Sequence, residues 1–217
     1  VLIEMGKTRV ICTVALEDRI PPFLVGTGKG WLTAEYGMLP GSSPRRIARE
    51  ASTGKVNSRG REIQRLIGRS LRATVDLDRI GERTLYVDCD VIQADGGTRT
   101  ASITGAYLAL QQAIKRLIRD DVLSSSPIVR RAAAVSVGLV DDKVLLDLDY
   151  SEDSRAQADV NLVMDGEGGI LEIQGTAEGR PYTRDEADRL LDVGASGIRK
   201  LLDLQAASFE SWLGNAT

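Results

Sequence analysis

The first half of the chain alternates between two hydrophobic periods. A period of two predicts strands, and it occurs over Val1–Glu4, Arg9–Leu16 and Thr84–Ala94. A helical period predicts amphipathic helices over Arg61–Thr74 and from about Ala101 to Arg119. The intervening stretch Glu17–Gly41 is rich in glycine and proline, which predicts a long irregular connection.

The second half predicts four strands and then a helix. The strands follow a Ser-Ser-Ser-Pro segment and cover Ala132–Val140, Lys143–Asp149, Asp159–Met164 and Gly169–Gly175. The helix begins near Thr183, where Thr183 and Glu186 match a capping box. Runs of strands followed by helices predict an α+β fold in which mixed sheets pack with helices in two-layer units. One interpretation is that this unit of strands and a helix occurs twice, as an internal pseudo-repeat. We expect one domain over residues 1–217, with a subdivision near 123–130 as the alternative.

Composition restricts the chemistry that the chain can perform. Its 217 residues are 42% hydrophobic and 27% charged, as is typical of a globular protein. No apolar run approaches the ~20 residues of a membrane helix, so we expect no membrane association. The location that we expect is cytoplasmic. The chain has no histidine, which excludes Ser-His-Asp nucleophiles and histidine-ligated metals. Acid–base and metal chemistry would then use carboxylates, lysine, tyrosine or cysteine.

Charge is concentrated in two segments. Residues 45–72 hold nine basic and two acidic residues, a net charge of +7, whereas residues 141–217 hold seven basic and 17 acidic residues, a net charge of −10. The basic residues are mostly arginine, whose planar fork suits phosphate and carboxylate groups. The basic segment therefore predicts a local anionic partner, with a solvated helix face or a subunit interface as the alternative.

The segment from Asp95 to Ser102 joins a predicted strand to a predicted helix. Gly96 and Gly97 allow the backbone to approach a ligand closely, and the helix start offers free N–H groups and a positive dipole end. Side chains able to donate to an anion follow: Thr98, Arg99, Thr100 and Ser102. This combination favours a phosphate site over an ordinary glycine turn, although it is not a P-loop.

Five carboxylates lie close together in the acidic second half. They are Asp147, Asp149, Glu152, Asp153 and Asp159, within 13 residues. Clustered carboxylates repel one another unless a cation offsets them, and magnesium needs only one or two of them together with substrate phosphate oxygens. A solvated acidic hairpin is the alternative.

Several blocks of sequence resemble the ribonuclease PH family. They occur along nearly the whole chain, at residues 6–12, 28–36 with 38–40, 62–72, 88–100, Glu152-Asp153 with Asp159, and 172–178. The resemblance implies the family's fold and a phosphorolytic 3′→5′ exoribonuclease that trims the 3′ ends of tRNA precursors and other RNA. In that reaction inorganic phosphate releases nucleoside 5′-diphosphates, so the enzyme is formally a nucleotidyltransferase. It also implies a hexamer built as a trimer of dimers, and an N-terminal stretch before Val1 that we expect to be trimmed or disordered.

The resemblance also implies roles for individual residues. Those matching phosphate-binding positions are Arg59, Gly97, Thr98, Arg99 and Thr100. Asp153 and Asp159 match the catalytic carboxylates, which are expected to hold Mg²⁺ or Mn²⁺. Arg46 and Arg49 match arginines of the RNA surface and the subunit contacts.

Two other functions remain as alternatives. The same fold serves inactive ring subunits of exosomes, which tend to lose the phosphate-loop arginine and the paired aspartates. Arg99, Asp153 and Asp159 are all present, which favours the enzyme. An unrelated magnesium-dependent phosphotransferase would need a glycine loop with a lysine, and the chain shows no such motif.

Overall fold

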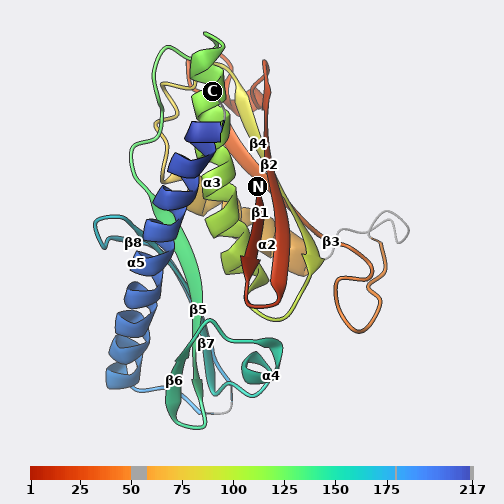
Figure 1. Ribbon diagram of the computed structural model, residues 1–217, viewed down its shortest axis with the longest axis vertical. Coiled ribbons are helices and arrows are strands. Elements are labelled where there is room, and N and C mark those ends of the chain that lie inside the picture. Colours follow the sequence, from red (N-terminus) through yellow and green to blue (C-terminus); the bar gives the residue numbers. More distant parts are fainter. Residues whose placement is uncertain (50–57, 179, 216–217) are drawn as a thin grey trace.

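Two four-stranded sheets organise the residues that the computed structural model describes, 1–49, 58–178 and 180–215 (Figure 1). The first sheet has the spatial order β1 (Leu2–Met5), β2 (Thr8–Glu17), β4 (Thr84–Gln93), β3 (Trp31–Met38). The second has the order β6 (Lys143–Leu146), β5 (Ala132–Val140), β7 (Ala158–Asp165), β8 (Ile170–Ala177). The helical elements are η1 (Pro22–Leu24), α2 (Ser58–Arg72), α3 (Thr98–Arg119), α4 (Tyr150–Asp153) and α5 (Arg184–Asn215). The predicted α+β class is confirmed.

The prediction of an irregular connection over Glu17–Gly41 is wrong for its second half. β3 lies there and pairs in parallel with β4, whereas the other strand pairs are antiparallel. Buried Leu32, Ala34 and Tyr36 alternate with more exposed neighbours, so the period of two was present in the sequence. The surrounding glycines and prolines obscured it, and parallel pairing with a distant strand leaves no local turn signal.

Helix α3 occupies the middle of the molecule (Figure 1). From Thr98 to Leu110 every side chain except that of Arg99 is buried. A helix that is buried all round must pack against neighbours on every side. One side of α3 packs against the first sheet through residues such as Ile103 and Tyr107, and the same core includes Ala134 and Val163 of the second sheet.

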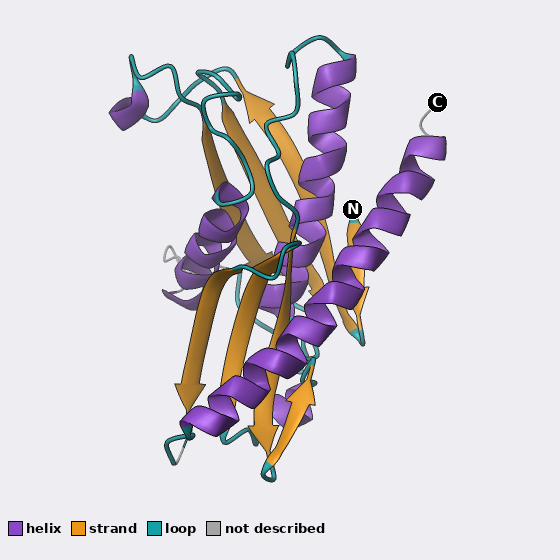
Figure 2. Cartoon of the chain, turned by 90° about the vertical axis from the view of Figure 1, so that its left-hand side faces the viewer, coloured by secondary structure: helices purple, strands orange, loops and turns teal. Residues whose placement is uncertain are grey.

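Strand β5, at the centre of the second sheet, is buried on both faces. Ala132 and Ala134 of β5 lie in the core shared with α3, whereas Val135 and Val137 lie in a separate core with Leu190 of α5. This alternation explains why every residue of β5 is buried. Figure 2 shows α5 lying across this sheet and continuing beyond it. No helix of the described residues is long and apolar enough to cross a membrane.

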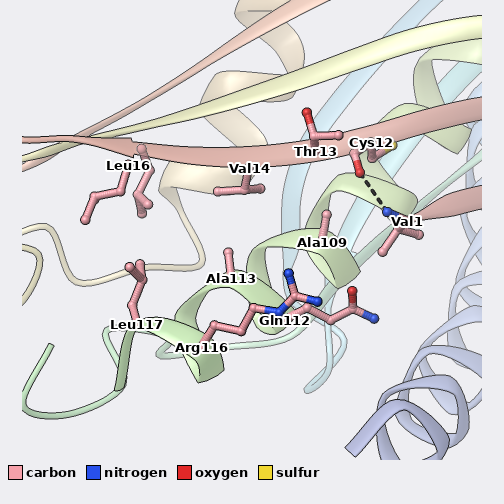
Figure 3. Close-up of a pocket in the computed structure, with 11 residues that line it drawn as sticks. Val1, Cys12, Thr13, Val14, Leu16, Ala109, Gln112, Ala113, Arg116 and Leu117 are labelled. Atoms are coloured by element: carbon pink, nitrogen blue, oxygen red, sulfur yellow. Dashed lines mark hydrogen bonds between the residues drawn. The ribbon is translucent and has the colours of Figure 1, made fainter. Parts of the chain in front are cut away.

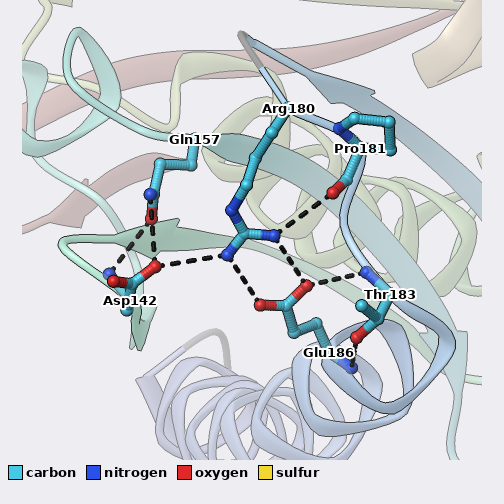
Figure 4. Close-up of polar contacts among 6 residues, drawn as sticks. All are labelled: Asp142, Gln157, Arg180, Pro181, Thr183 and Glu186. Carbon is cyan, nitrogen blue, oxygen red and sulfur yellow. Dashed lines mark hydrogen bonds and ion pairs between the residues drawn. The ribbon is translucent and has the colours of Figure 1, made fainter.

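A network centred on Arg180 holds the start of α5 (Figure 4). The Arg180 guanidinium donates to both carboxylate oxygens of Glu186, at 2.8 and 3.1 Å, and to Asp142 Oδ1, at 3.2 Å, in the turn between β5 and β6. The capping box predicted at Thr183 is confirmed, because each backbone N–H of Thr183 and Glu186 donates to the other side chain. We call these contacts the Arg180 network.

The predicted strand Lys143–Asp149 is too long. β6 ends at Leu146, and Asp149 instead begins α4 with a capping box to Glu152. The two central helices start earlier than predicted, at Ser58 and Thr98. The two sheets differ in strand order and in pairing direction, so the internal pseudo-repeat stays a prediction.

Candidate active site

The loop between β4 and α3 brings the two halves of the molecule together. Gly96 has a φ of 82°, and a Cβ atom there would collide with the carbonyl oxygen of Leu148. Gly97 is also left-handed, with a φ of 56°, and a Cβ on it would lie 3.5 Å from Asp147 Oδ1. Glycine is therefore required at Gly96 both by the backbone angle and by the space. The close approach places the start of α3 beside the acidic segment that follows β6.

Hydroxyl groups at the start of α3 have distinct partners. Thr98 Oγ1 accepts a 2.9 Å hydrogen bond from the buried Tyr36 hydroxyl, which leaves its own proton free to donate to a ligand. Thr100 Oγ1 donates to the Gly97 carbonyl at 3.0 Å. Thr100 and Ser102 are both fully buried, and Ser102 donates to the Thr98 carbonyl. Both hydroxyl protons are therefore used inside the protein, so the predicted contact of the Ser102 hydroxyl with an anion is wrong and Thr100 could bind an anion only through its backbone N–H. The first backbone N–H groups of α3 have no acceptor within the helix.

Arg99 is held by residues from two other elements. Its Nη2 donates to Glu62 Oε2 of α2 at 3.1 Å, and Gln174 Nε2 of β8 donates to Glu62 Oε1 at 2.6 Å. Arg99 Nε and Gln174 Oε1 are buried and have no hydrogen-bond partner within the part of the chain that the structure describes. We call these three residues the Arg99 network. Unpartnered buried polar atoms are rare in folded proteins, and they indicate a place for a ligand or water.

Asp159 lies within electrostatic reach of Asp153 and of two arginines. Burial, and next the negative charge of Asp153, raises the pKa of Asp159 to about 6. Positive charge from Arg99 and Arg59 acts in the opposite direction. Asp159 lies on β7 and Asp153 at the end of α4. The structure thus brings together Arg59, Arg99, Asp153 and Asp159, which come from four different elements.

The remaining carboxylates of the acidic cluster serve other purposes. Asp149 and Glu152 are used in the capping box of α4, where backbone hydrogen bonds lower the pKa of Asp149. Burial, together with Glu152, raises the pKa of Asp147. Among the described residues no group of three or more such side chains is arranged to hold a metal ion. A cation there would have to rely on the Asp153–Asp159 pair and on oxygens of a substrate.

Arg46 and Arg49 lie on the exposed loop that follows β3. The Ser42 carbonyl in this loop accepts a 2.7 Å hydrogen bond from Ala94 N, which places the loop beside the end of β4. Of the basic segment 45–72, residues 50–57 lie outside the described part of the chain.

Sequence reasoning missed Glu62 and Gln174 as site residues. Glu62 had one available signal, because it lies one helical turn after Arg59 on the face of α2 that meets β8. Gln174 had none, because its contact with α2 spans 112 positions of sequence.

A separate groove lies between β2 and α3 (Figure 3). It encloses about 340 Å³ and is lined mainly by small and apolar side chains, including Val14, Leu16, Ala109 and Ala113. At its rim the Val1 amino group donates to the Cys12 carbonyl at 2.9 Å. The groove contains none of the predicted site residues.

Family comparisons match both halves of the chain. The model of the 3′ exoribonuclease family, domain 1, matches residues 1–116, and that of domain 2 matches residues 131–197. The chain is 57% identical to the ribonuclease PH of Synechococcus sp. (strain CC9605), across 96% of the chain and 83% of that protein. It is 58% identical to the ribonuclease PH of Neisseria gonorrhoeae (strain NCCP11945), across 94% of the chain and 84% of that protein.

The chain belongs to the ribonuclease PH family. It is a phosphorolytic 3′ exoribonuclease that processes tRNA precursors and uses inorganic phosphate as co-substrate. Solved structures share the ribonuclease PH fold at lower identity. An Archaeoglobus fulgidus exosome with RNA bound to the active site matches with a TM-score of 0.75 at 22% identity, covering 92% of this chain and 80% of that one. Rice Rrp46 matches with a TM-score of 0.73 at 15% identity, covering 95% and 86%.

Proposed function

We propose that the chain captures inorganic phosphate at the start of α3 and directs it at the 3′-terminal phosphodiester of RNA. The observation that carries this proposal is the buried, unpartnered Nε of Arg99 beside a helix N-terminus. The Thr98 hydroxyl, the first N–H groups of α3 and the Arg59 guanidinium complete a set of donors suited to an anion.

The reaction then needs little acid–base help from the protein. An oxygen of the captured phosphate forms a bond to the terminal phosphorus, and the bond from that phosphorus to the preceding O3′ breaks. The proton of the phosphate passes to O3′, which leaves a shortened RNA with a 3′ hydroxyl and a nucleoside 5′-diphosphate. Two phosphates repel each other, so the principal task of Arg59 and Arg99 is to offset their charge in the right geometry. This task suits a chain without histidine.

Asp153 and Asp159 fit a divalent cation such as Mg²⁺ or Mn²⁺. They provide the oxygen ligands that hard cations prefer, and burial together with the like charge of Asp153 disfavours ionisation of Asp159 when no cation is bound. When bound, the cation supplies positive charge against the phosphate oxygens. Asp153→Asn should weaken Mn²⁺ binding measured by calorimetry. Glu167→Gln, in the exposed turn after β7, serves as the control because it removes an equal charge elsewhere. Equal affinity in both variants would contradict the metal assignment.

The decisive experiment for phosphate capture uses two arginines of α2. RNA labelled at its 3′ nucleotide is incubated with Mg²⁺ and increasing phosphate, and the product is identified as a nucleoside diphosphate or monophosphate. Arg59→Ala should raise the KM for phosphate about tenfold or more, whereas Arg61→Ala should leave it unchanged, because Arg61 is an exposed arginine of the same helix that contributes no charge to Asp159. An equal KM in both variants would overturn the proposed site.

The exposed loop with Arg46 and Arg49 is proposed to contact RNA phosphates. Removal of one arginine–phosphate pair should lower the slope of log affinity against log salt by about 0.7 for a single strand. Arg46→Ala should show this smaller slope in RNA binding measured between low and moderate salt. An unchanged slope would assign the loop to subunit contacts instead.

We also propose that six chains assemble as a trimer of dimers. One archaeal neighbour was solved as an exosome core, with a TM-score of 0.71 at 20% identity. A hexamer of 23.4 kDa chains should scatter light as a particle of about 140 kDa. A cytoplasmic location is proposed because both cysteines are buried free thiols, as expected in a reducing compartment, and cell fractionation tests it.

A further inference from the structure

Helix α2 and strand β8 are joined by two polar bridges. In the first, Glu62 accepts from Gln174 at 2.6 Å and also from Arg99 at 3.1 Å. In the second, Arg69 donates to Glu172 at 2.6 Å. Glu172 and Gln174 are two residues apart on β8, so their side chains project from the same face of the strand. The two bridges link the same pair of elements, but only the first touches a residue of the phosphate site.

Glu62 is ionised under ordinary conditions. Burial alone would raise its pKa, but the hydrogen bonds from Gln174 and Arg99 outweigh burial and hold the pKa below its usual value. A carboxylate fixed on one oxygen by an amide can offer the other oxygen to a guanidinium in a defined direction. The Gln174 amide is thus a support for Glu62, and Glu62 is a support for Arg99.

The contact with Glu62 uses only part of the hydrogen-bonding capacity of Arg99. A guanidinium carries five N–H donors, and the buried Nε–H of Arg99 has no partner. Arginine has many rotamers, and fixing one of them before the ligand arrives reduces the entropy lost on binding. The Arg99 side chain is 23% exposed, so most of its surface is already packed.

We infer that Glu62, held by Gln174, is a positioning residue that orients the Arg99 guanidinium for phosphate capture. Glu62 does not touch phosphate, because a carboxylate facing an anion would repel it. This inference rests on the proposed function, in which Arg99 binds phosphate. It adds a dependence of phosphate binding on β8, an element of the second half of the chain.

The test compares equivalent changes in the two bridges, using the phosphate-dependent assay at saturating RNA. Glu62→Ala should raise the KM for phosphate about tenfold, with a smaller change in the KM for RNA. Glu172→Ala breaks the other bridge between α2 and β8 and should leave the KM for phosphate within twofold of wild type. Glu62→Gln keeps an acceptor for Arg99 and should recover part of the loss. Thermal unfolding of each variant verifies that the protein is folded.

A double variant isolates the route through Arg99. In an Arg99→Ala background, Glu62→Ala should change the KM for phosphate no further, because the Arg99 guanidinium that Glu62 orients is absent. If Glu62→Ala and Glu172→Ala changed the KM for phosphate equally, Glu62 would only link α2 to β8. If Glu62→Ala lowered the KM for phosphate, Glu62 would act only through its negative charge. Either result overturns the inference. If Arg99→Ala itself kept the wild-type KM for phosphate, the proposed function would fail, and this inference with it.

Discussion

The Arg99 and Arg180 networks both pair an arginine with carboxylates, but they differ in how many hydrogen-bond acceptors the arginine has. Arg180 donates to a carbonyl and to two carboxylates, and these contacts hold the start of α5 against the turn between β5 and β6. Arg99 has one carboxylate partner and retains a buried Nε without an acceptor. A completed polar network stabilises a fold, whereas an incomplete one retains binding capacity for a ligand. The difference separates an arginine that maintains structure from one that is available to substrate.

Removing Arg99 should produce the largest effect on activity. Arg99→Ala should lower kcat/KM for phosphate by about 100-fold or more, because it deletes a donor directed at developing negative charge. Its thermal unfolding temperature should change little. Steady-state kinetics and calorimetry measure the two quantities. A large drop in unfolding temperature, with activity per folded molecule retained, would place Arg99 in the same class as Arg180.

Asp159 should make activity dependent on pH near neutrality. Its pKa of about 6 means that the carboxyl is protonated below that pH, and a protonated carboxyl neither binds a cation nor bears charge. At a fixed Mg²⁺ concentration below saturation, activity should therefore fall by up to tenfold per pH unit below about pH 6, and raising Mg²⁺ should move this fall to lower pH because a bound cation favours the ionised carboxyl. A flat profile between pH 5 and 7 would contradict the role of Asp159.

The same raised pKa predicts that stability changes with pH in the direction opposite to activity, so that the folded state loses stability as pH rises. A carboxyl whose pKa rises on folding favours the folded state when protonated, and this contribution is lost as pH rises through about 6. Asp159→Asn should therefore stabilise the cation-free protein at pH 7.5, by on the order of 1–2 kcal/mol. Denaturant unfolding in a chelator measures the difference. The variant should be inactive, and lower stability than wild type would mean that the carboxylate is a structural partner.

Removing Arg180 should reverse the pattern expected for Arg99. Arg180→Ala leaves Glu186 and Asp142 without their shared partner, so the thermal unfolding temperature should fall. The KM for phosphate should stay at its wild-type value at temperatures where the variant is folded. A raised KM without loss of stability would show that the two networks are not functionally separate.

The smallest expected effect is the acid sensitivity that Glu186 confers. Arg180 and the Thr183 backbone lower the pKa of Glu186 to about 2. A depressed carboxyl pKa stabilises the fold above the unfolded pKa near 4.3, and this contribution is lost as pH falls toward about 2. Glu186→Gln should therefore lower stability at pH 6 and make the remaining loss toward pH 2 shallower. Parallel acid-unfolding curves would contradict this assignment.

Local patterns identified most elements and the start of the site. The period of two in β2 and β4 and the helical period in α2 reflect burial of one face of each element, and the polarity of the side chains shows which face that is. Likewise, the Gly96-Gly97 turn before a helix indicates an anion site from neighbouring residues alone. β3 escaped prediction because its partner is distant in sequence and parallel to it.

The sequence by itself determined which chemistry is available to this protein. The absence of histidine, the Asp95–Ser102 segment and the family blocks specify phosphate and carboxylate chemistry. Only the tertiary structure decided which members of each set take part. Asp149 and Glu152 are used in a helix cap, and Ser102 is buried. Arg99 is linked through Glu62 to Gln174 of β8, a strand of the second sheet. The reason is physical: side-chain chemistry is a local property, whereas burial and hydrogen-bond pairing depend on residues that folding brings together across the whole chain.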